Sequence, residues 1–504
     1  MRARRQSELD RRHCVAQHGD AMPSLNKPAI VWFRDDLRLA DHPALSAAVE
    51  TGAPLICIFV LDQERRGPDF RPHGDASKWW LAQSLRALSA SLKARDADLI
   101  LRHGPAARVI SDVAGEADAA TVFWNKVDVA SDIAVAADLA ERLAVKGIAV
   151  HEAQGDLLVS PVDARTAGGS GPRVFTPFWR RLRARGDPPQ PLRAPQKLRC
   201  GPRIVSERLE HWALEPTTPD WAGGLRETWT PGEAGAHARL DRFLQGAKGY
   251  GERRDFPDTT ATSALSPHLR FGEITPRQVW HAARFAAERD AALASDIEKF
   301  LSELGWREFC RHLLFDLPSL AEHSLQHQFE AFPWRTDKAG LKAWTRGLTG
   351  YPIVDAGMRE LWHTGVMHNR VRMIAASFLV KDLLIDWREG ERWFWDTLVD
   401  ADPGSNPGNW QWVAGCGADA APYFRIFNPV LQGEKFDPNG TYVRRWVPEL
   451  SKLPNELIHK PWTAAPLELA SAAIELGTTY PHPIVDHKAA RERALAALAS
   501  IKRR

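Results

Sequence analysis

Between residues 28 and 155 the sequence alternates between two kinds of segment. Ala- and Leu-rich stretches with helical spacing, such as residues 77–94, separate short runs of β-branched and aromatic residues. The runs are AIVWF (29–33), PLICIFV (54–60), DLILR (98–102), ATVFW (120–124) and GIAVHE (147–152). Strands that alternate with helices form βαβ units of a parallel sheet. The pattern therefore predicts a Rossmann-like α/β domain at 28–155.

The pattern changes twice after this region. Residues 156–232 are rich in Pro and Gly, as in GDPPQPLRAPQ, which predicts a long interdomain linker that wraps over a domain surface. From residue 233 to residue 504 strand signals nearly vanish and helical periodicity prevails, so we expect an all-α domain there. A chain of 504 residues is long enough for this division into two domains.

Several classes of protein are disfavoured by what the sequence lacks. The first predicted strand is followed by FRDDLRLADHPAL rather than GxGxxG, which argues against NAD binding. No run approaches the roughly eighteen apolar residues of a membrane helix. The five cysteines show neither a disulfide nor a metal-ligand spacing, so we expect a reduced, cytoplasmic protein without a metal site. Residues 1–27 are basic but contain no apolar run, so we expect no targeting signal there but either a disordered extension or an upstream start, with the true start at Met22.

Polar and aromatic residues gather in four segments of the predicted helical domain. In the first, Thr262, Ser263 and Ser266 stand before a helical pattern and could cap it. Hydroxyls and free N–H groups at a cap suit a phosphate, although an ordinary capping loop contains the same residues. In the second, Glu303 and Arg307 lie at i,i+4 on one helix face. They form either a surface ion pair or a partly buried pair in which the Glu has a raised pKa.

The third segment is GVMHNRVRMIAASFLVKDLLIDW, residues 365–387. Arg370 and Arg372 point to different sides of a helix, so one can serve an outer anionic partner and the other an inner group. Lys381 and Asp382 lie in an apolar run, where each charge needs a partner.

The fourth segment contains SNPGNWQWVAG (405–415), which combines turn-forming residues with two tryptophans. Indoles are costly to leave in water, so either a core passes close to this turn or a flat aromatic ligand lies against it. If the segment were helical, Trp410 and Trp412 would point about 200° apart and face opposite ways.

Tryptophan is unusually frequent, with 20 Trp against 5 Tyr. Most of these residues can simply fill a helical core, but aromatic walls and electron relays would give the same composition. Together the four segments predict a pocket with carboxylates, an amide and aromatic walls, which indicates a large planar cofactor. Because the formal net charge is only +3, contact with nucleic acid would depend on local Arg clusters.

Several long motifs follow one another along the chain: VWFRDDLRLADHPAL, VFTPFW, YGERRDFP, TSALSPHLRFGEI, ELGWREFCRHLL, TGYPIVDAGMREL, MHNRVRMIAASFLVKDLLIDW and GNWQWVAGCGADAAPYFRIFNP. Through these motifs residues 28–487 resemble the photolyase/cryptochrome family, and most closely its microbial class I photolyases, which act on cyclobutane pyrimidine dimers. The resemblance implies an α/β antenna domain joined to a helical domain that binds FAD. It also implies light-driven repair, in which excited reduced FAD donates an electron to a dimer flipped out of the DNA.

The resemblance further implies roles for individual residues. The positions that match FAD-binding residues are Tyr250, Thr262, Ser263, Ala264, Leu265, Ser266, Phe300, Arg307, Asn369, Arg372, Asp382, Asp400, Ala401, Asp402 and Asn406. The positions that match lesion- and DNA-contacting residues are Glu303, Trp306, Arg307, Asn369, Arg370, Met373, Trp412 and Gln432. Among these, Asn406 is expected to face flavin N5 and Glu303 to hydrogen-bond to the dimer. Trp410, Trp387 and Trp334 match the tryptophan relay that photoreduces the flavin.

The sequence also departs from the family. Val366 and Phe300 stand where relatives commonly have Trp, and Ala264 stands where a larger polar residue is frequent. These changes remove no reacting group but could lower the affinity for the cofactor. The usual folate-site pattern is missing after VFWN, which makes Asn125 a weak anchor. The resemblance therefore leaves open a second chromophore of folate or deazaflavin type.

Two alternatives to dimer repair are a cryptochrome-like blue-light photoreceptor and a flavoprotein that binds nucleic acid without repairing it. The short end after ALASIKRR weighs against the photoreceptor, since signalling tails are commonly long. Asn406 and the MHNR motif favour cyclobutane dimers over (6-4) lesions as the substrate. The expected partner is damaged DNA, with no membrane, and the expected state is a monomer.

Overall fold

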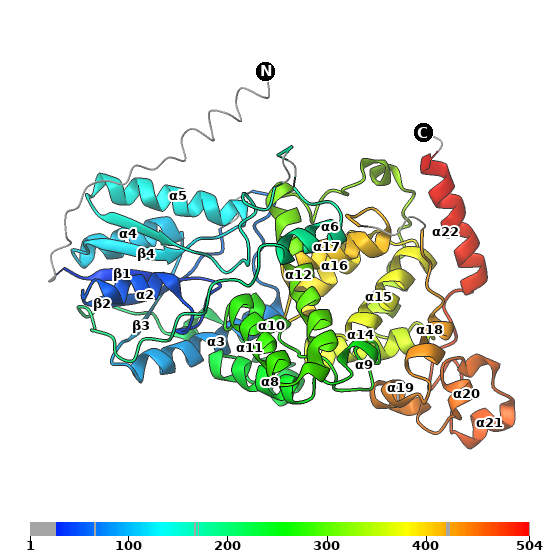
Figure 1. Ribbon diagram of the computed structural model, residues 1–504. Helices are drawn as coiled ribbons and strands as arrows, with labels where there is room; N and C mark the ends of the chain where they lie inside the picture. Colours follow the sequence, from blue (N-terminus) through cyan, green and yellow to red (C-terminus); the bar gives the residue numbers. More distant parts are fainter. Residues whose placement is uncertain (1–26, 65–66, 166–167, 170, 420–423, 503–504) are drawn as a thin grey trace.

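The computed structural model describes residues 27–502, apart from 65–66, 166–167, 170 and 420–423. The predicted extension at 1–27 lies outside the described residues except for Lys27. In the N-terminal part, five parallel strands form one sheet with the order β3-β2-β1-β4-β5 (Figure 1). The strands are β1 (Ala29–Phe33), β2 (Leu55–Leu61), β3 (Leu99–His103), β4 (Thr121–Asn125) and β5 (Ala149–Ala153). Each predicted strand is found, with its ends displaced by at most two residues.

Helices cover both faces of this sheet, which explains why its central strands are continuous apolar runs. The helices are α2 (Pro43–Glu50), α3 (Asp75–Lys93), α4 (Ala106–Glu116) and α5 (Ala130–Val145). Alternate side chains of β1 enter two separate cores. Val31 and Phe33 pack in the cluster that contains the α3 side chains, whereas Ile30 and Trp32 pack with α4 and α5.

The predicted linker crosses between the two parts but is not without structure. It contains the helices α6 (Phe175–Arg183) and α7 (Gly223–Thr228). At residue 200 it runs beside the sheet, where Leu55 N donates to Arg199 O at 2.7 Å and Gly201 N donates to Leu55 O at 2.8 Å. These backbone bonds form a parallel bridge between Leu55 and Cys200, so this part of the Pro- and Gly-rich segment is held beside the start of β2.

The remainder is helical, as predicted. Its helices are α8 (Glu233–Gln245), α9 (Tyr250–Arg253), α10 (Ser266–Arg270), α11 (Pro276–Arg289), α12 (Ala294–Asp316), α13 (Lys338–Thr345), α14 (Pro352–Thr364), α15 (Asn369–Ser377), α16 (Trp387–Thr397), α17 (Ser405–Ala414), α18 (Pro429–Phe436), α19 (Thr441–Trp446), α20 (Asn455–Ile458), α21 (Pro466–Ser471) and α22 (His487–Lys502). A π-helical turn, Phe378–Asp382, follows α15. The expected fold class, a parallel α/β domain joined to an all-helical domain, is confirmed.

Buried polar contacts join the two domains. Trp80 Nε1 on α3 donates to Glu273 Oε1 at 3.0 Å. Arg38 Nη1 donates to the carbonyl oxygen of Gly272 at 2.9 Å. Because such groups are costly to bury without partners, the domains are held in one arrangement.

Candidate functional site

Three residues predicted to bind the cofactor meet around one buried carboxylate. Asp400 follows α16, and its two oxygens accept hydrogen bonds from Arg372 Nη2 at 3.1 and 2.9 Å. Ser266 Oγ, at the start of α10, donates to Asp400 Oδ2 at 2.6 Å. Only 4% of the Asp400 side chain is exposed, so these bonds are shielded from water. Residues from three separate helical regions therefore form one polar cluster.

Asp402 lies two residues further on, just before α17. Its Oδ1 accepts from the N–H groups of Gly404 at 2.9 Å and Ser405 at 2.7 Å. Burial opposes ionisation of Asp402, but Arg311, 3.1 Å away, and neighbouring guanidiniums outweigh it and lower its pKa to about 2. Asp402 is therefore a permanent anion that fixes the turn between α16 and α17.

The loop before α10 carries the predicted phosphate-binding residues. The prediction that their hydroxyls cap the helix is wrong, because the cap position is occupied by Leu265, which makes no side-chain cap bond. Within the described chain no partner contacts the hydroxyls of Thr262 and Ser263, so both can bind a ligand. Ala264 has a φ of 51°, which costs an L-residue about 1–2 kcal/mol. Such strain is typical of functional loops.

Asp382 does not join this group. Its Oδ1 lies 2.5 Å from His487 Nδ1, and its carbonyl oxygen accepts from Arg493 Nη2 at 2.6 Å, both on α22. Ten residues of helix separate Asp382 from Arg372, or about 15 Å of rise. Asp382 is thus bound to α22 through Oδ1, while its Oδ2 is buried without a partner among the described residues, and its assignment to the cofactor stays a prediction. The expected need of a partner is confirmed for both charges, since Lys381 Nζ lies 3.3 Å from the Phe424 ring centroid.

The predicted contact face of α12 is present, but its ion pairs differ from those expected. Glu303 pairs with Arg254 and, at 3.5 Å, with Lys299, whereas Arg307 pairs with Glu308 at 3.1 Å. The expected Glu303–Arg307 pair is therefore wrong, because both side chains find nearer partners. The deeply buried carboxyl is Glu308, whose pKa burial raises to about 7 against the opposing charge of Arg307.

Trp306, on the same face, stacks on Phe175 of α6. The ring centroids are 3.8 Å apart and the planes differ by 7°. One face of the indole is thus supported, and the other can serve as a platform for a planar group. Sequence reasoning assigned no role to Phe175 or to Arg254, although both lie in the motifs VFTPFW and YGERRDFP.

On α15 the two arginines diverge as predicted. Arg372 turns inward to Asp400, whereas Arg370 Nη2 donates to Asp255 at 2.7 Å. Asn369 is exposed, and its Nδ2 lies 3.9 Å from the sulfur of Met373 one turn later. Arg370 and Glu303 thus contact adjacent residues, Asp255 and Arg254, which brings α15 and α12 to the same place.

The segment 405–414 is helix α17 rather than a turn, so its Asn, Pro and Gly lie in a helical end. Trp410 is 3% exposed and packs against Phe394 at 5.0 Å and Trp344 at 6.1 Å between centroids. Trp412 is half-buried and its Nε1 donates to Asp419 O at 3.0 Å. The two indoles have different surroundings, as the helical alternative predicts.

The three tryptophans of the predicted relay belong to one apolar cluster. Trp410 and Trp387 are buried in it, and Trp334 packs against it while remaining half-buried. The cluster therefore extends from the interior toward the surface.

Asn406, on the first turn of α17, is fixed by Glu391 of α16. Asn406 Nδ2 donates to the carbonyl oxygen of Glu391 at 3.0 Å and to its Oε1 at 2.8 Å. Because both partners are acceptors, the amide nitrogen faces Glu391 and Oδ1 points away. No donor in the described residues reaches that oxygen.

The remaining predicted residues are less informative. Tyr250 and Phe300 pack edge to face at 5.9 Å, in a core that also contains Leu265. Ala401 contributes its carbonyl oxygen, which accepts from Arg270 Nε at 2.8 Å. Gln432 lies half-buried on α18.

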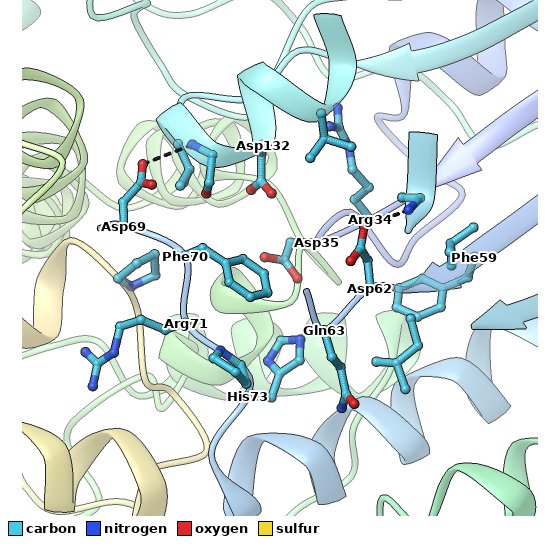
Figure 2. A pocket seen from close by; sticks show the side chains of 18 of the residues that line it. Arg34, Asp35, Phe59, Asp62, Gln63, Asp69, Phe70, Arg71, His73 and Asp132 are labelled. Atoms are coloured by element: carbon cyan, nitrogen blue, oxygen red, sulfur yellow. Dashed lines mark hydrogen bonds between the residues drawn. The ribbon is translucent and has the colours of Figure 1, made fainter. Parts of the chain in front are cut away.

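A second candidate site is a pocket at the carboxyl ends of β1 and β2, next to α5 (Figure 2). It lies where the strand order reverses between β1 and β4, the place at which open α/β sheets bind ligands. Arg34 lies 4.3 Å over the Trp32 ring, and both Arg34 Nη1 and Trp32 Nε1 are buried without a partner among the residues that the structure describes. Asp132 faces the same pocket, and burial raises its pKa.

Asn125 does not serve this pocket. Its Oδ1 accepts from Ala44 N at 2.9 Å, and its Nδ2 donates to Asp36 Oδ2 at 2.8 Å. The proposed anchor is therefore corrected to a structural residue, whose polar groups are satisfied within the sheet domain.

The residues around Asp400 fit FAD in their chemistry. Unpaired hydroxyls on the loop of Thr262 and Ser263 suit a diphosphate. The Arg372–Asp400 pair and the open Oδ1 of Asn406 suit the polar edge of an isoalloxazine ring. Together the parallel sheet domain, the helical domain and this cluster define a flavoprotein of the photolyase class.

Comparisons with known proteins also indicate the photolyase class. Residues 29–196 match the DNA photolyase family model, and residues 300–500 match the FAD binding domain of DNA photolyase. A deoxyribodipyrimidine photo-lyase of Agrobacterium fabrum is 53% identical over 94% of this chain and 98% of its own length. Cryptochrome-1 of Arabidopsis thaliana is 40% identical over 94% of this chain and 70% of its own length. A crystal structure of a bacterial class III photolyase from Agrobacterium tumefaciens is 52% identical, with a TM-score of 0.91, and covers 98% of this chain and 100% of its own.

The chain belongs to the DNA photolyase/cryptochrome family. The prediction of an enzyme with an FAD-binding domain is confirmed. The 52% identical crystal structure is of a class III photolyase, which does not support the class I assignment expected from the motifs. No helix in the described ranges is long and apolar enough to cross a membrane.

Proposed function

We propose that this protein repairs cyclobutane pyrimidine dimers in DNA when illuminated. The observation that carries the proposal is the convergence of α12 and α15 on the segment Arg254–Asp255. Glu303 contacts Arg254 and Arg370 contacts Asp255. A platform, Trp306, lies one turn from Glu303 on α12. An aromatic wall, a carboxylate and guanidiniums in one place support a lesion-binding site.

Each of these groups has a task in binding a lesion. Photolyases take the lesion out of the duplex, and a damaged base is cheaper to unstack than an intact one. Stacking on Trp306 would contribute about 1–3 kcal/mol per base. Glu303 would accept hydrogen bonds from the base edges, and Arg254 beside it would add positive charge. When bound, FAD supplies light-driven donation of one electron to the lesion.

The test uses purified protein with reduced FAD, an oligonucleotide containing one thymine dimer, and blue light. We expect light-dependent loss of the dimer. Glu303→Ala should lower the repair yield while FAD stays bound, whereas Glu298→Ala, on the outer part of the same helix, should not. If illumination removes no dimers, the repair proposal is contradicted and the photoreceptor alternative is favoured. The similarity to Cryptochrome-1 of Arabidopsis thaliana is consistent with that alternative.

We also propose that Trp410, Trp387 and Trp334 relay electrons to the flavin during photoreduction. Their common cluster, which runs from a buried residue to a half-buried one, supports this role. Trp410→Phe should slow photoreduction of oxidised flavin but leave repair intact once the flavin is reduced chemically. Loss of repair by the prereduced variant would contradict the relay.

The pocket next to β1 is proposed to hold the second chromophore, of folate or deazaflavin type. Both molecules have a flat heteroaromatic ring with amide-like edges, which suits the Trp32 ring, the unpaired donors and Asp132. Equilibrium dialysis with a reduced folate and, separately, with a deazaflavin distinguishes the two. Arg34→Gln should weaken binding of the true ligand, and failure of both to bind would contradict this assignment. We further propose that the protein acts as a monomer in the cytoplasm.

A further inference from the structure

Arg71 belongs to the pocket of Figure 2 but also reaches the site of Asn406. It lies on the segment between β2 and α3 that carries Asp69 and Phe70, at the edge of the pocket. Its Nη1 pairs with Glu391 Oε1, the same oxygen that accepts from Asn406 Nδ2. A chain of contacts thus leads from the α/β domain to the amide on α17.

The Arg71 end of this series of contacts is rigidly held. The Arg71 guanidinium lies 4.0 Å over the Trp395 ring, and Trp395 Nε1 donates to Pro72 O at 2.9 Å. The ring and the backbone therefore fix Arg71 from two sides. Side chains of Arg71 and Glu391 are 17% and 2% exposed, so water screens their attraction poorly.

Glu391 needs such a partner to remain a carboxylate. Burial raises the pKa of Glu391, and Arg71 is the charge that most strongly opposes the rise. As a carboxylate, Glu391 can only accept hydrogen bonds, so it holds the Asn406 nitrogen. A protonated carboxyl would instead offer a donor to Asn406 Oδ1. If the Asn406 amide turned to accept that hydrogen bond, its Oδ1 would also lie against the backbone carbonyl oxygen of Glu391, which is unfavourable. Neither orientation of the Asn406 amide would then be clearly preferred.

We propose that Arg71 is a positioning residue for the flavin site, which acts through Glu391 to keep Asn406 Oδ1 directed at the cofactor. The proposal rests on the proposed position of Asn406 against flavin N5. An acceptor there favours the form of the flavin that carries a proton on N5, so the Arg71–Glu391 contact favours reduced FAD. The α/β domain thereby contributes to the chemistry of the helical domain.

The experiment measures the reduction potential of FAD bound to the wild type and to variants. Arg71→Gln should lower the ratio of reduced to oxidised flavin about tenfold at a given applied potential, or about 59 mV for a one-electron couple. Arg71→Lys, which keeps the charge, should recover most of the loss. Arg142→Gln is the matched control, because Arg142, on α5 of the same domain, pairs with Asp138 and contacts neither Glu391 nor the pocket. It should leave the potential unchanged.

A double-mutant cycle tests the route through Glu391. A Gln at position 391 carries no charge for Arg71 to stabilise, so Arg71→Gln should have no further effect in the Glu391→Gln background. Additive shifts in the two variants, or an unchanged potential in Arg71→Gln, would overturn the proposal. If Arg71→Gln loses FAD, the double variant should regain it, and failure to do so also overturns the proposal.

Asn406→Ala separates this inference from the function on which it rests. If Asn406→Ala leaves the potential unchanged, the position of Asn406 at N5 is wrong. If Asn406→Ala shifts the potential but Arg71→Gln does not, only the role of Arg71 is refuted.

Discussion

Gly390, a buried residue of α16, leaves the space that the Trp410 indole occupies. A Cβ at this position would overlap the six-membered ring of Trp410 and would lie 2.6 Å from Leu379 Cδ2. The indole can therefore pack against the α16 backbone only because residue 390 has no side chain. This contact sets the depth of Trp410 in the apolar cluster.

We predict that Gly390→Ala destabilises the protein by about 1–3 kcal/mol, the usual cost of overpacking a core. The loss should occur although Ala favours a helix interior by about 1 kcal/mol over Gly. Urea unfolding measures it. Gly408→Ala on α17 is the control, because a Cβ there would meet Cys310 Sγ at an ordinary 3.4 Å. Equal stability of the two variants would contradict the packing argument.

Among the elements, α22 is held to the helical domain by a buried polar contact. Asp382 is fully buried in the π-helical turn, and its carboxylate lies 2.5 Å from His487 Nδ1. Burial raises the pKa of Asp382, and His487 opposes the rise. A carboxyl left there without its partner would bear the cost of desolvation alone.

We predict that His487→Ala lowers the free energy of unfolding by about 1–3 kcal/mol, as expected when a buried group loses its partner. Hydrogen exchange should become faster in α22 than elsewhere, because the helix loses its anchor. Lys488→Ala changes the exposed neighbouring residue, and it should neither lower the free energy of unfolding nor speed up hydrogen exchange in α22. Faster exchange in both variants would show that the histidine contact is not the anchor.

At the scale of the whole molecule, buried histidines make stability depend on pH. His312 on α12 is 1% exposed, and burial lowers its pKa to about 4, with a bond to Val159 O partly opposing. The unfolded chain binds a proton near pH 6.5, whereas the folded chain does so only near pH 4. The contribution of His312 to the free energy of unfolding is therefore fully present above the pKa of the histidine in the unfolded chain. It declines as the pH falls toward 4.

For His312 alone, the free energy of unfolding is expected to fall by about 2 kcal/mol between pH 7 and pH 5. His312→Gln should reduce the pH dependence of unfolding by this amount, since a neutral amide can also donate to Val159 O. Urea unfolding at the two pH values measures the difference. His363→Gln, at an exposed position, is the control, and an identical pH dependence in wild type and His312→Gln would refute the assignment.

Much of the fold could be predicted because periodicity is a local property. The five strands were found within two residues, since β-branched runs between amphipathic helices have one common solution. Pairings of long side chains could not be predicted this way. The i,i+4 spacing suggested Glu303–Arg307, yet Arg254, 49 residues earlier, is the partner of Glu303. Likewise, composition indicated a turn at 405–415, where packing against α16 stabilises a helix.

The sequence by itself determined the two domains, the order of the strands and helices along the chain, and the residue types available for a flavin site. Motif resemblance added candidate roles. Only the tertiary structure decided which candidates meet: Ser266, Arg372 and Asp400 come together, whereas Asp382 goes to α22 and Asn125 to the sheet interior. It alone brought Arg71 to Glu391, 320 residues away. Local patterns are set by backbone geometry, whereas partners of buried charges are set by which surfaces of distant elements come into contact.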